Sequence, residues 1–231
     1  MPGYQVKHER IAVTGVADLQ IRSLLDRQQF ADPLGVALRL GISSAAWPLF
    51  GLLWPSGYQL AARMALRPVC QGERILEIGC GLALASLVSH RRGADITASD
   101  CHPLAASFLA ENVRLNALAQ LPYRHGHWQD DTFGVEGPVG LLPVQGRYDL
   151  IIGSDLLYER DERGSLAGFI ARHALPSAAV WMVDPNRGNR PAFARHMRLL
   201  GFSLHEQRLD VPATFDTAAY KGRLLVFSRV V

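Results

Sequence analysis

Short apolar runs alternate with stretches of helical periodicity over the last two thirds of the chain. Apolar runs that predict buried strands lie at residues 74–78, 95–99, 121–128, 148–153 and 179–183. Patterns that predict helices lie between them, at residues 82–92, 103–116 and 164–173. Strands that alternate with helices form right-handed βαβ units, in which helices cover both faces of a parallel sheet. The pattern therefore predicts a doubly wound α/β fold.

The end of the chain shows a different arrangement of the same elements. Two apolar runs, at residues 203–209 and 223–230, follow a predicted helix at residues 190–200 and have no helix between them. Parallel neighbours need a long crossover, so two strands without one are expected to pair in antiparallel fashion. We therefore expect a seven-stranded sheet that is mostly parallel and has an antiparallel C-terminal strand pair.

The first 70 residues do not follow the strand–helix alternation. Residues 16–30 have helical spacing of apolar positions, with Leu19, Leu24 and Leu25 among them. Residues 31–57 carry few charges and many turn-forming residues. We expect a helix over residues 16–30, and we expect residues 1–70 to form an accessory segment packed on a main domain of residues 71–231.

Composition narrows the classes of function. Of the 231 residues, 48% are hydrophobic and 19% are charged, as in globular proteins. The net charge of +3 is too small for the basic stripe of a nucleic-acid-binding protein. No apolar run reaches the roughly 20 residues that a membrane-spanning helix needs, and the first ten residues lack the apolar core of a secretory signal. We expect a cytoplasmic protein without nucleic-acid or membrane partners.

The metal-binding residue types are sparse. Cys70, Cys80 and Cys101 have no CxxC spacing, which argues against a zinc site or a disulfide framework. The histidines nearest to the candidate site below, among them His102 and His127, show no ligand spacing with a third ligand. We therefore expect no metal.

The strongest chemical signal is a glycine turn between a strand and a helix, Glu77-Ile78-Gly79-Cys80-Gly81-Leu82-Ala83. Gly79 and Gly81 allow a tight turn and a close approach of a ligand to the backbone. Asp100 ends the next strand, where it is placed to accept hydrogen bonds from ribose hydroxyls. The third glycine of a dinucleotide fingerprint is replaced by Leu84. Glu77 instead suits a cationic group, such as the amino end of S-adenosylmethionine (SAM).

These residues carry a resemblance to a known family. The glycine turn with Asp100 resembles motif I and its acidic partner in the class I, seven-β-strand SAM-dependent methyltransferases. More narrowly, Asp155 and Tyr158 in Ser154-Asp155-Leu156-Leu157-Tyr158 resemble the Asp-x-x-Tyr motif of the family-16 protein lysine methyltransferases. Trp54 in Leu53-Trp54-Pro55-Ser56-Gly57 resembles that family's upstream tryptophan segment, and Trp128 stands where the family has a tryptophan after the third strand.

The resemblance covers about residues 47–231 and includes departures. The sequence Val183-Asp184-Pro185-Asn186-Arg187 is similar to the lysine methyltransferases of the electron transfer flavoprotein β subunit. Ala83 stands where many members have a third glycine. Gly126-His127 replaces the commoner Leu-Asp before the tryptophan, which puts the adenine contacts there in doubt.

The resemblance implies a Rossmann-like fold, SAM as cofactor with S-adenosylhomocysteine as product, and a lysine of a protein substrate as methyl acceptor. The electron transfer flavoprotein β subunit is one candidate for that substrate. Asp155 would orient the amine and Tyr158 would form part of the pocket wall. The cofactor-binding residues implied are Trp54, Glu77, Gly79, Gly81, Asp100, Cys101, Trp128 and Ser154. Because no dimerisation helix stands out, we expect a monomer.

Purely structural interpretations remain open for several of these residues. Asp155 could cap the following helix, Trp54 and Trp128 could be core residues, and Tyr158 a half-buried surface aromatic. For Arg187 and Arg190 we favour a solvated loop. Two other functions also remain open: N-methylation of a small amine or N-heterocycle such as nicotinamide, and a non-catalytic SAM-binding scaffold.

Overall fold

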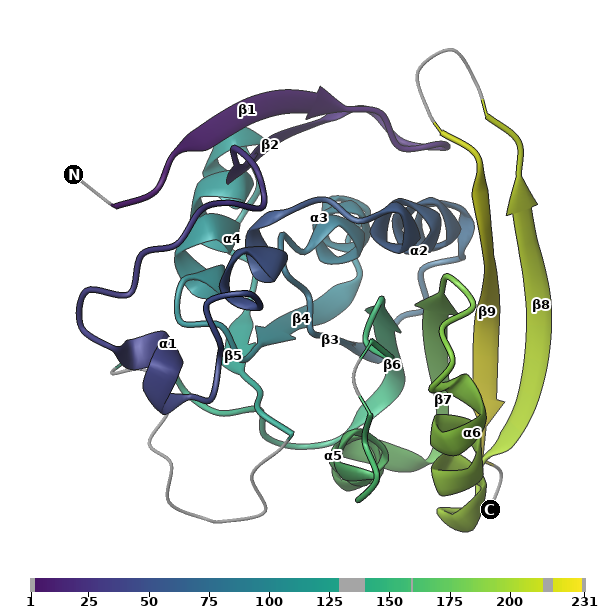
Figure 1. Ribbon diagram of the computed structural model, residues 1–231. Helices are drawn as coiled ribbons and strands as arrows, with labels where there is room; N and C mark the ends of the chain where they lie inside the picture. The colour runs from purple at the N-terminus through teal and green to yellow at the C-terminus, as the bar shows by residue number, and fades with distance from the viewer. Residues whose placement is uncertain (1–2, 129–139, 159, 214–217, 230–231) are drawn as a thin grey trace.

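A seven-stranded sheet forms the centre of the protein (Figure 1). The computed structural model describes residues 3–128, 140–158, 160–213 and 218–229. The strand order is β5-β4-β3-β6-β7-β9-β8. The strands are β3 (Arg74–Ile78), β4 (Asp95–Asp100), β5 (Tyr123–His125), β6 (Tyr148–Ser154), β7 (Ala174–Asp184), β8 (Ser203–Val211) and β9 (Tyr220–Ser228). The strands from β3 to β7 pair in parallel, whereas β9 is antiparallel to both β7 and β8. The predicted mixed, mostly parallel sheet is confirmed.

Helices cover both faces of this sheet (Figure 1). One face carries α2 (Pro55–Leu66), α3 (Leu84–Arg91) and α4 (Ala105–Leu115), and the other carries α5 (Ser165–His173) and α6 (Arg190–Leu199). Neighbouring residues of a strand point to opposite faces, so the central strands need apolar side chains at successive positions. In β3, Ile75 packs into the apolar cluster on the first face and Leu76 into the cluster on the second.

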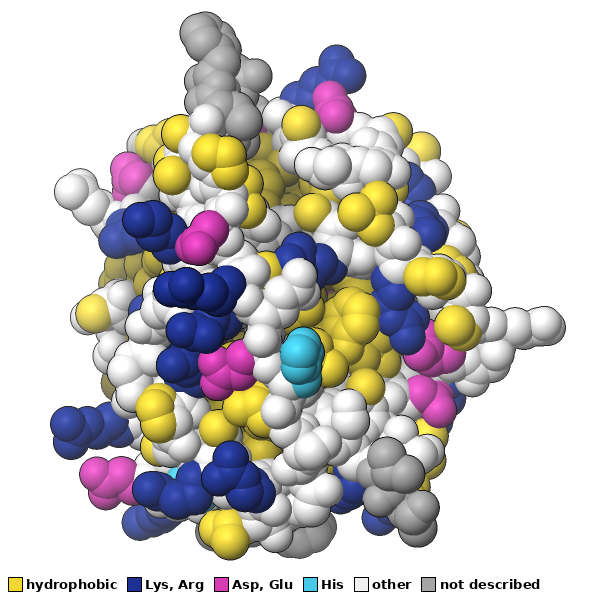
Figure 2. Space-filling model, turned by 90° about the vertical axis from the view of Figure 1, so that its right-hand side faces the viewer, with side chains coloured by type: hydrophobic (Ala, Val, Ile, Leu, Met, Phe, Trp, Pro, Cys, Tyr) yellow, Lys and Arg dark blue, Asp and Glu magenta, His cyan; other side chains and the backbone are white. Residues whose placement is uncertain are grey.

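The free edge of the sheet is charged. Figure 2 shows the face on which β8 and β9 lie, where acidic and basic side chains are interspersed with hydrophobic ones. On the edge strand β8, Glu206 forms ion pairs with Arg223 at 3.1 Å and with Arg190 at 3.5 Å. Charged side chains on an edge strand oppose pairing with another chain.

The helix expected over residues 16–30 is wrong. That segment instead contains β2 (Leu19–Leu24), which pairs in antiparallel fashion with β1 (Val6–Ile11). Along β2, Leu19 and Ile21 are fully buried while Gln20 between them is exposed. This is the two-residue period of a strand with one face on the core. The two-stranded sheet packs against α4, where the buried Asn112 accepts a hydrogen bond of 2.7 Å from the backbone N–H of Arg22.

The chain then runs through α1 (Val36–Arg39) and the short 3-10 helix η1 (Trp47–Gly51) before it enters α2. The ring of Trp47 is almost completely buried and meets the ring of Phe50 edge-on, with 5.8 Å between centroids. Trp47 is therefore a packing residue of the core. Among the described residues, no helix is long and apolar enough to cross a membrane.

Candidate active site

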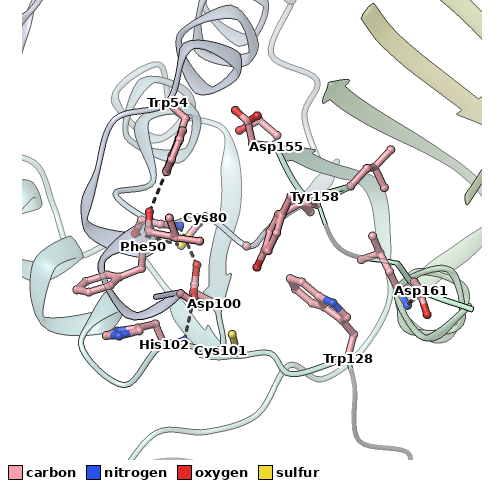
Figure 3. Close-up of a pocket in the computed structure, with 18 of the residues that line it drawn as sticks. Phe50, Trp54, Cys80, Asp100, Cys101, His102, Trp128, Asp155, Tyr158 and Asp161 are labelled. Atoms are coloured by element: carbon pink, nitrogen blue, oxygen red, sulfur yellow. Dashed lines mark hydrogen bonds between the residues drawn. The ribbon is translucent and has the colours of Figure 1, made fainter. Parts of the chain in front are cut away.

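A cavity of about 1180 Å³ opens at the carboxyl ends of β3, β4 and β6 (Figure 3). Ligands of open α/β sheets bind at this edge. All ten residues singled out from the sequence line the cavity, from five separate segments of the chain. They are Trp54, Glu77, Gly79, Gly81, Asp100, Cys101, Trp128, Ser154, Asp155 and Tyr158. The fold thus gathers one polar and aromatic site from positions up to about a hundred residues apart.

The turn after β3 requires both of its glycines. Gly79 and Gly81 have φ angles of +54° and +52°, which residues other than glycine rarely adopt. A β carbon on Gly81 would lie 2.9 Å from the carbonyl oxygen of Phe50, and one on Gly79 would overlap the side chain of Leu156. Ala83 also adopts a positive φ of +58°, at the residue that precedes α3. Backbone conformation and close neighbours therefore both require glycine at positions 79 and 81.

Asp100 connects this turn to the end of β4. Its Oδ2 accepts a hydrogen bond of 2.8 Å from the backbone N–H of Gly81, and its Oδ1 accepts one of 2.8 Å from the N–H of His102. Burial raises the pKa of the Asp100 carboxyl, and these backbone hydrogen bonds oppose that effect. Asp100 is thus held in one orientation on the cavity wall.

Glu77 is buried at the base of the cavity. Its Oε2 accepts hydrogen bonds from the hydroxyl of Ser86 and, at 2.8 Å, from the backbone N–H of the same residue. Ser86 lies in the first turn of α3, where unpaired N–H groups favour a negative charge. Burial raises the pKa of Glu77 to about 7, and the neighbouring Asp100 adds to this, while the Ser86 hydrogen bonds lower it. Glu77 thus stabilises the start of α3 as well as lining the cavity.

Asp155 follows β6 in a left-handed conformation with a φ of +59°. Its Oδ1 receives a hydrogen bond of 3.0 Å from Nη2 of Arg187. Its Oδ2 is buried and has no hydrogen-bond partner among the described residues. The next helix, α5, is capped instead by Asp161, whose two carboxylate oxygens accept the N–H groups of Ser165 and Leu166 at 2.8 and 2.9 Å. The helix-cap interpretation of Asp155 is therefore wrong.

Three of the aromatic side chains that border the cavity were expected from the sequence. Trp54 is partly buried and donates from Nε1 to the carbonyl oxygen of Leu49 at 2.9 Å, while the guanidinium of Arg27 lies 4.9 Å from the centre of its ring. Tyr158 is 45% exposed, and its hydroxyl end points into the cavity toward Asp100 and Trp128 (Figure 3). Because Trp54 and Trp128 both line the cavity and are only partly buried, neither is a plain core residue.

The expectation of a solvated loop is wrong for Arg187, which is a residue of the site. Arg187 lines the cavity and pairs with Asp155, whereas Arg190 bonds to Glu206 and Asn186 on the outside. The signal that could have found Arg187 is its place just after β7, which is the strand next to β6 at the same edge of the sheet. Within the described ranges, no group of three or more His, Cys, Asp or Glu side chains could hold a metal ion.

Comparison with known proteins identifies relatives among protein methyltransferases. No protein-family model matches the sequence. The chain is 28% identical over 169 residues to the electron transfer flavoprotein beta subunit lysine methyltransferase of Mus musculus, which covers 71% of this chain and 60% of the relative. It is 31% identical over 121 residues to the protein N-lysine methyltransferase METTL21A of Danio rerio, or 52% of this chain and 50% of the relative. The chain thus spans less than two thirds of the length of these relatives.

Solved structures agree on the fold. The magnesium protoporphyrin IX methyltransferase of Synechocystis with bound SAM superposes with a TM-score of 0.56 at 17% identity, over 76% of this chain and 78% of that one. A methyltransferase of Pyrococcus furiosus gives a TM-score of 0.57 at 19% identity, over 84% of this chain and 98% of the other. The chain is therefore a homologue of the electron transfer flavoprotein β subunit and METTL21 lysine methyltransferases, with the fold of the class I SAM-dependent methyltransferases.

Proposed function

We propose that this protein is a SAM-dependent methyltransferase that N-methylates lysine side chains of a protein substrate. The observation that carries the proposal is the convergence of ten residues, from five segments, on one cavity at the carboxyl edge of the sheet. The relatives named above are protein methyltransferases, which supports a protein as the acceptor. The electron transfer flavoprotein β subunit is a candidate substrate because the relative from Mus musculus is named for it.

The cavity residues fit SAM in chemical type. Asp100 offers carboxylate oxygens for the ribose hydroxyls, and Cys101 and Trp128 line the same side for the adenine. Gly79 and Gly81 line the cavity without side chains, so the methionine part can approach the backbone there. The volume of about 1180 Å³ exceeds the roughly 300–1,000 Å³ of common small-molecule pockets. The cavity therefore has room for a cofactor and an acceptor side chain together.

The cofactor supplies a methyl group on a positively charged sulfur, which departs as a neutral thioether. The protein must then align the acceptor nitrogen with the methyl carbon, and alignment of this kind is worth about 7–11 kcal/mol. We assign that alignment to Asp155, which accepts a hydrogen bond from the amine, and to Tyr158, which forms the adjacent wall. Both residues follow β6 and lie on the same side of the cavity (Figure 3).

One relative makes arginine a second candidate for the methyl acceptor. The chain is 29% identical over 143 residues to the histone-arginine methyltransferase METTL23 of Rattus norvegicus, which covers 59% of this chain and 58% of the relative. Arginine methylation is thus a second candidate, and the test must separate the two modified residues.

Methyl transfer from labelled SAM into a lysate of the source organism tests the proposal. We expect label in a protein band and methyl-lysine after hydrolysis of that band, with a strong loss for Asp155→Asn. Asp18→Asn is the matched control, because Asp18 pairs with Arg10 on the surface, far from the cavity residues. Methyl-arginine would overturn the lysine acceptor, and label only in small molecules would overturn a protein substrate. Binding of SAM without any transfer would favour a non-catalytic scaffold.

A further inference from the structure

An ion pair ties the loop after β7 to the end of β6. Nη2 of Arg187 lies 3.0 Å from Oδ1 of Asp155, and the two side chains are 35% and 13% exposed. Asp184, the last residue of β7, also fixes this loop, because its Oδ1 accepts a hydrogen bond of 2.8 Å from the backbone N–H of Arg187. Arg187 is therefore placed by the fold, and its guanidinium occupies one of the two oxygens of Asp155.

The other oxygen of Asp155 is an unused hydrogen-bond acceptor. Oδ2 is buried and has no hydrogen-bond partner among the described residues, and a buried acceptor without a partner is costly. Asp155 lies at the cavity beside Trp54 and Tyr158 (Figure 3). An N–H group brought into the cavity would satisfy this oxygen.

The charge of Asp155 poses a problem for amine chemistry. A lysine attacks only as the neutral amine, yet its ordinary pKa is about 10.4. A lone carboxylate nearby would raise that pKa further, because it stabilises the ammonium. A cation paired with the carboxylate cancels most of this effect, since the incoming amine then meets a nearly neutral pair.

We propose that Arg187 is a positioning residue for the methyl acceptor. It neutralises Asp155 through Oδ1 and leaves Oδ2 to accept a hydrogen bond from a neutral amine. This inference rests on the proposed function. The lysine ammonium first loses a proton to water; the nitrogen lone pair then forms the N–C bond as the C–S bond breaks. The sulfur departs with the bonding electron pair, and the positive charge ends on the methylated nitrogen.

The other groups that face Asp155 preserve this balance. Asp184, at the end of β7, is the second carboxylate, and Arg190 is a second cation that acts on it. Tyr220 on β9 approaches both carboxylates, and burial together with their charges raises its pKa to about 12, so it stays neutral. Its hydroxyl is hydrogen-bonded to Ser56 of α2 at 2.9 Å. Arg190 also pairs with Glu206, whereas Arg187 is the cation that an ion pair links to Asp155, so its loss leaves that carboxylate without its paired charge.

The variant that tests the inference is Arg187→Gln, which removes the cation. Arg114→Gln is the matched control, because Arg114 pairs with Glu111 on the exposed face of α4 and does not line the cavity. Arg187→Lys keeps the charge and serves as the conservative rescue. The first readout needs no catalysis: binding of n-butylammonium, a mimic of the lysine side chain, is measured by NMR titration at pH 7. We expect Arg187→Gln to bind it about tenfold more tightly than the native protein, Arg114→Gln or Arg187→Lys do.

The second readout is the pH profile of methyl transfer to the labelled protein of the lysate. We expect the rise of kcat with pH to move up by about one pH unit in Arg187→Gln, a tenfold loss at neutral pH. Arg114→Gln and Arg187→Lys should keep the native profile. Equal n-butylammonium binding in all four proteins, or an unmoved profile in Arg187→Gln, would overturn the inference. If the native protein transfers no methyl group, the proposed function fails, and the n-butylammonium titration still judges Arg187 separately.

Discussion

The backbone N–H of Gly81 donates a hydrogen bond of 2.8 Å to Oδ2 of Asp100 and so joins the turn after β3 to the end of β4. The same glycine lies against the carbonyl oxygen of Phe50 in η1. Three segments of the chain therefore meet at a position without a side chain. The shape of the cavity at the expected ribose site depends on this contact.

Replacement of Gly81 by alanine should damage both folding and cofactor binding. The alanine would have to keep the left-handed φ of Gly81, and its β carbon would lie 2.9 Å from a backbone oxygen. We therefore expect the free energy of unfolding to fall by more than about 1 kcal/mol. Binding of SAM, measured by calorimetry, should weaken at least about tenfold, which corresponds to about 1.4 kcal/mol. Gly72→Ala is the control, because Gly72 has a φ of +81° and no atom within 4 Å of an added β carbon. Equal losses in the two variants would contradict the role of crowding at Gly81.

Replacement of Asp155 should affect the rate of methyl transfer, whereas replacement of Asp161 should affect stability. Asp155→Asn keeps a residue that tolerates the left-handed conformation, so its melting temperature should stay near the native value. Its rate of methyl transfer should fall about 10²-fold, because the acceptor nitrogen is no longer held in line with the methyl carbon. Asp161→Ala removes the cap of α5 and should lower the free energy of unfolding by about 1 kcal/mol. Thermal denaturation measures the stability of the two variants, and a single-turnover assay measures their rates of methyl transfer. A native transfer rate in Asp155→Asn would show that Asp155 takes no part in the reaction.

Glu77 should make stability depend on pH. Burial raises its pKa to about 7 from an ordinary value of 4.5, so the folded protein favours the protonated form. The stability that Glu77 contributes is therefore complete below pH 4.5 and is lost as the pH rises through about 7, a change of about 3 kcal/mol. Glu77→Gln cannot ionise and should lack this loss. Urea denaturation of both proteins between pH 4.5 and 8 measures it; parallel curves would show that Glu77 is not the titrating group.

Asn112 should hold the β1–β2 sheet to the rest of the protein. Its Oδ1 accepts the N–H of Arg22, and its side chain is fully buried. Asn112→Ala leaves that N–H without a partner, which should cost about 1–3 kcal/mol and speed proteolysis within residues 6–24. Arg114→Ala, on the exposed side of α4, is the control. Slower cleavage of the seven-stranded sheet than of residues 6–24 would support an accessory segment of residues 1–70, and cleavage of both at one rate would argue against it.

Most of the seven-stranded sheet was predictable because its strands are short, buried runs bounded by helices. The site residues were predictable for a related reason: parallel strands end at one edge, so motifs that follow β3, β4 and β6 must converge there. The β1–β2 pair could not be predicted in this way, because Leu24 and Leu25 follow one another and interrupt the alternation that Leu19 and Ile21 begin. The place of Arg187 after β7 puts it at the same edge of the sheet, but its pairing with Asp155, 32 residues earlier, has no local sequence pattern.

The hydrogen bond between Arg22 and Asn112 spans 90 residues of sequence. At about 5–20 residues per second, a ribosome needs roughly 5–18 s to make that stretch. During this time the apolar face of β2, with Leu19 and Ile21, has been synthesised but α4 has not. The rate of translation between these two residues therefore determines how long the apolar face of the β1–β2 hairpin stays exposed to water before α4 can cover it.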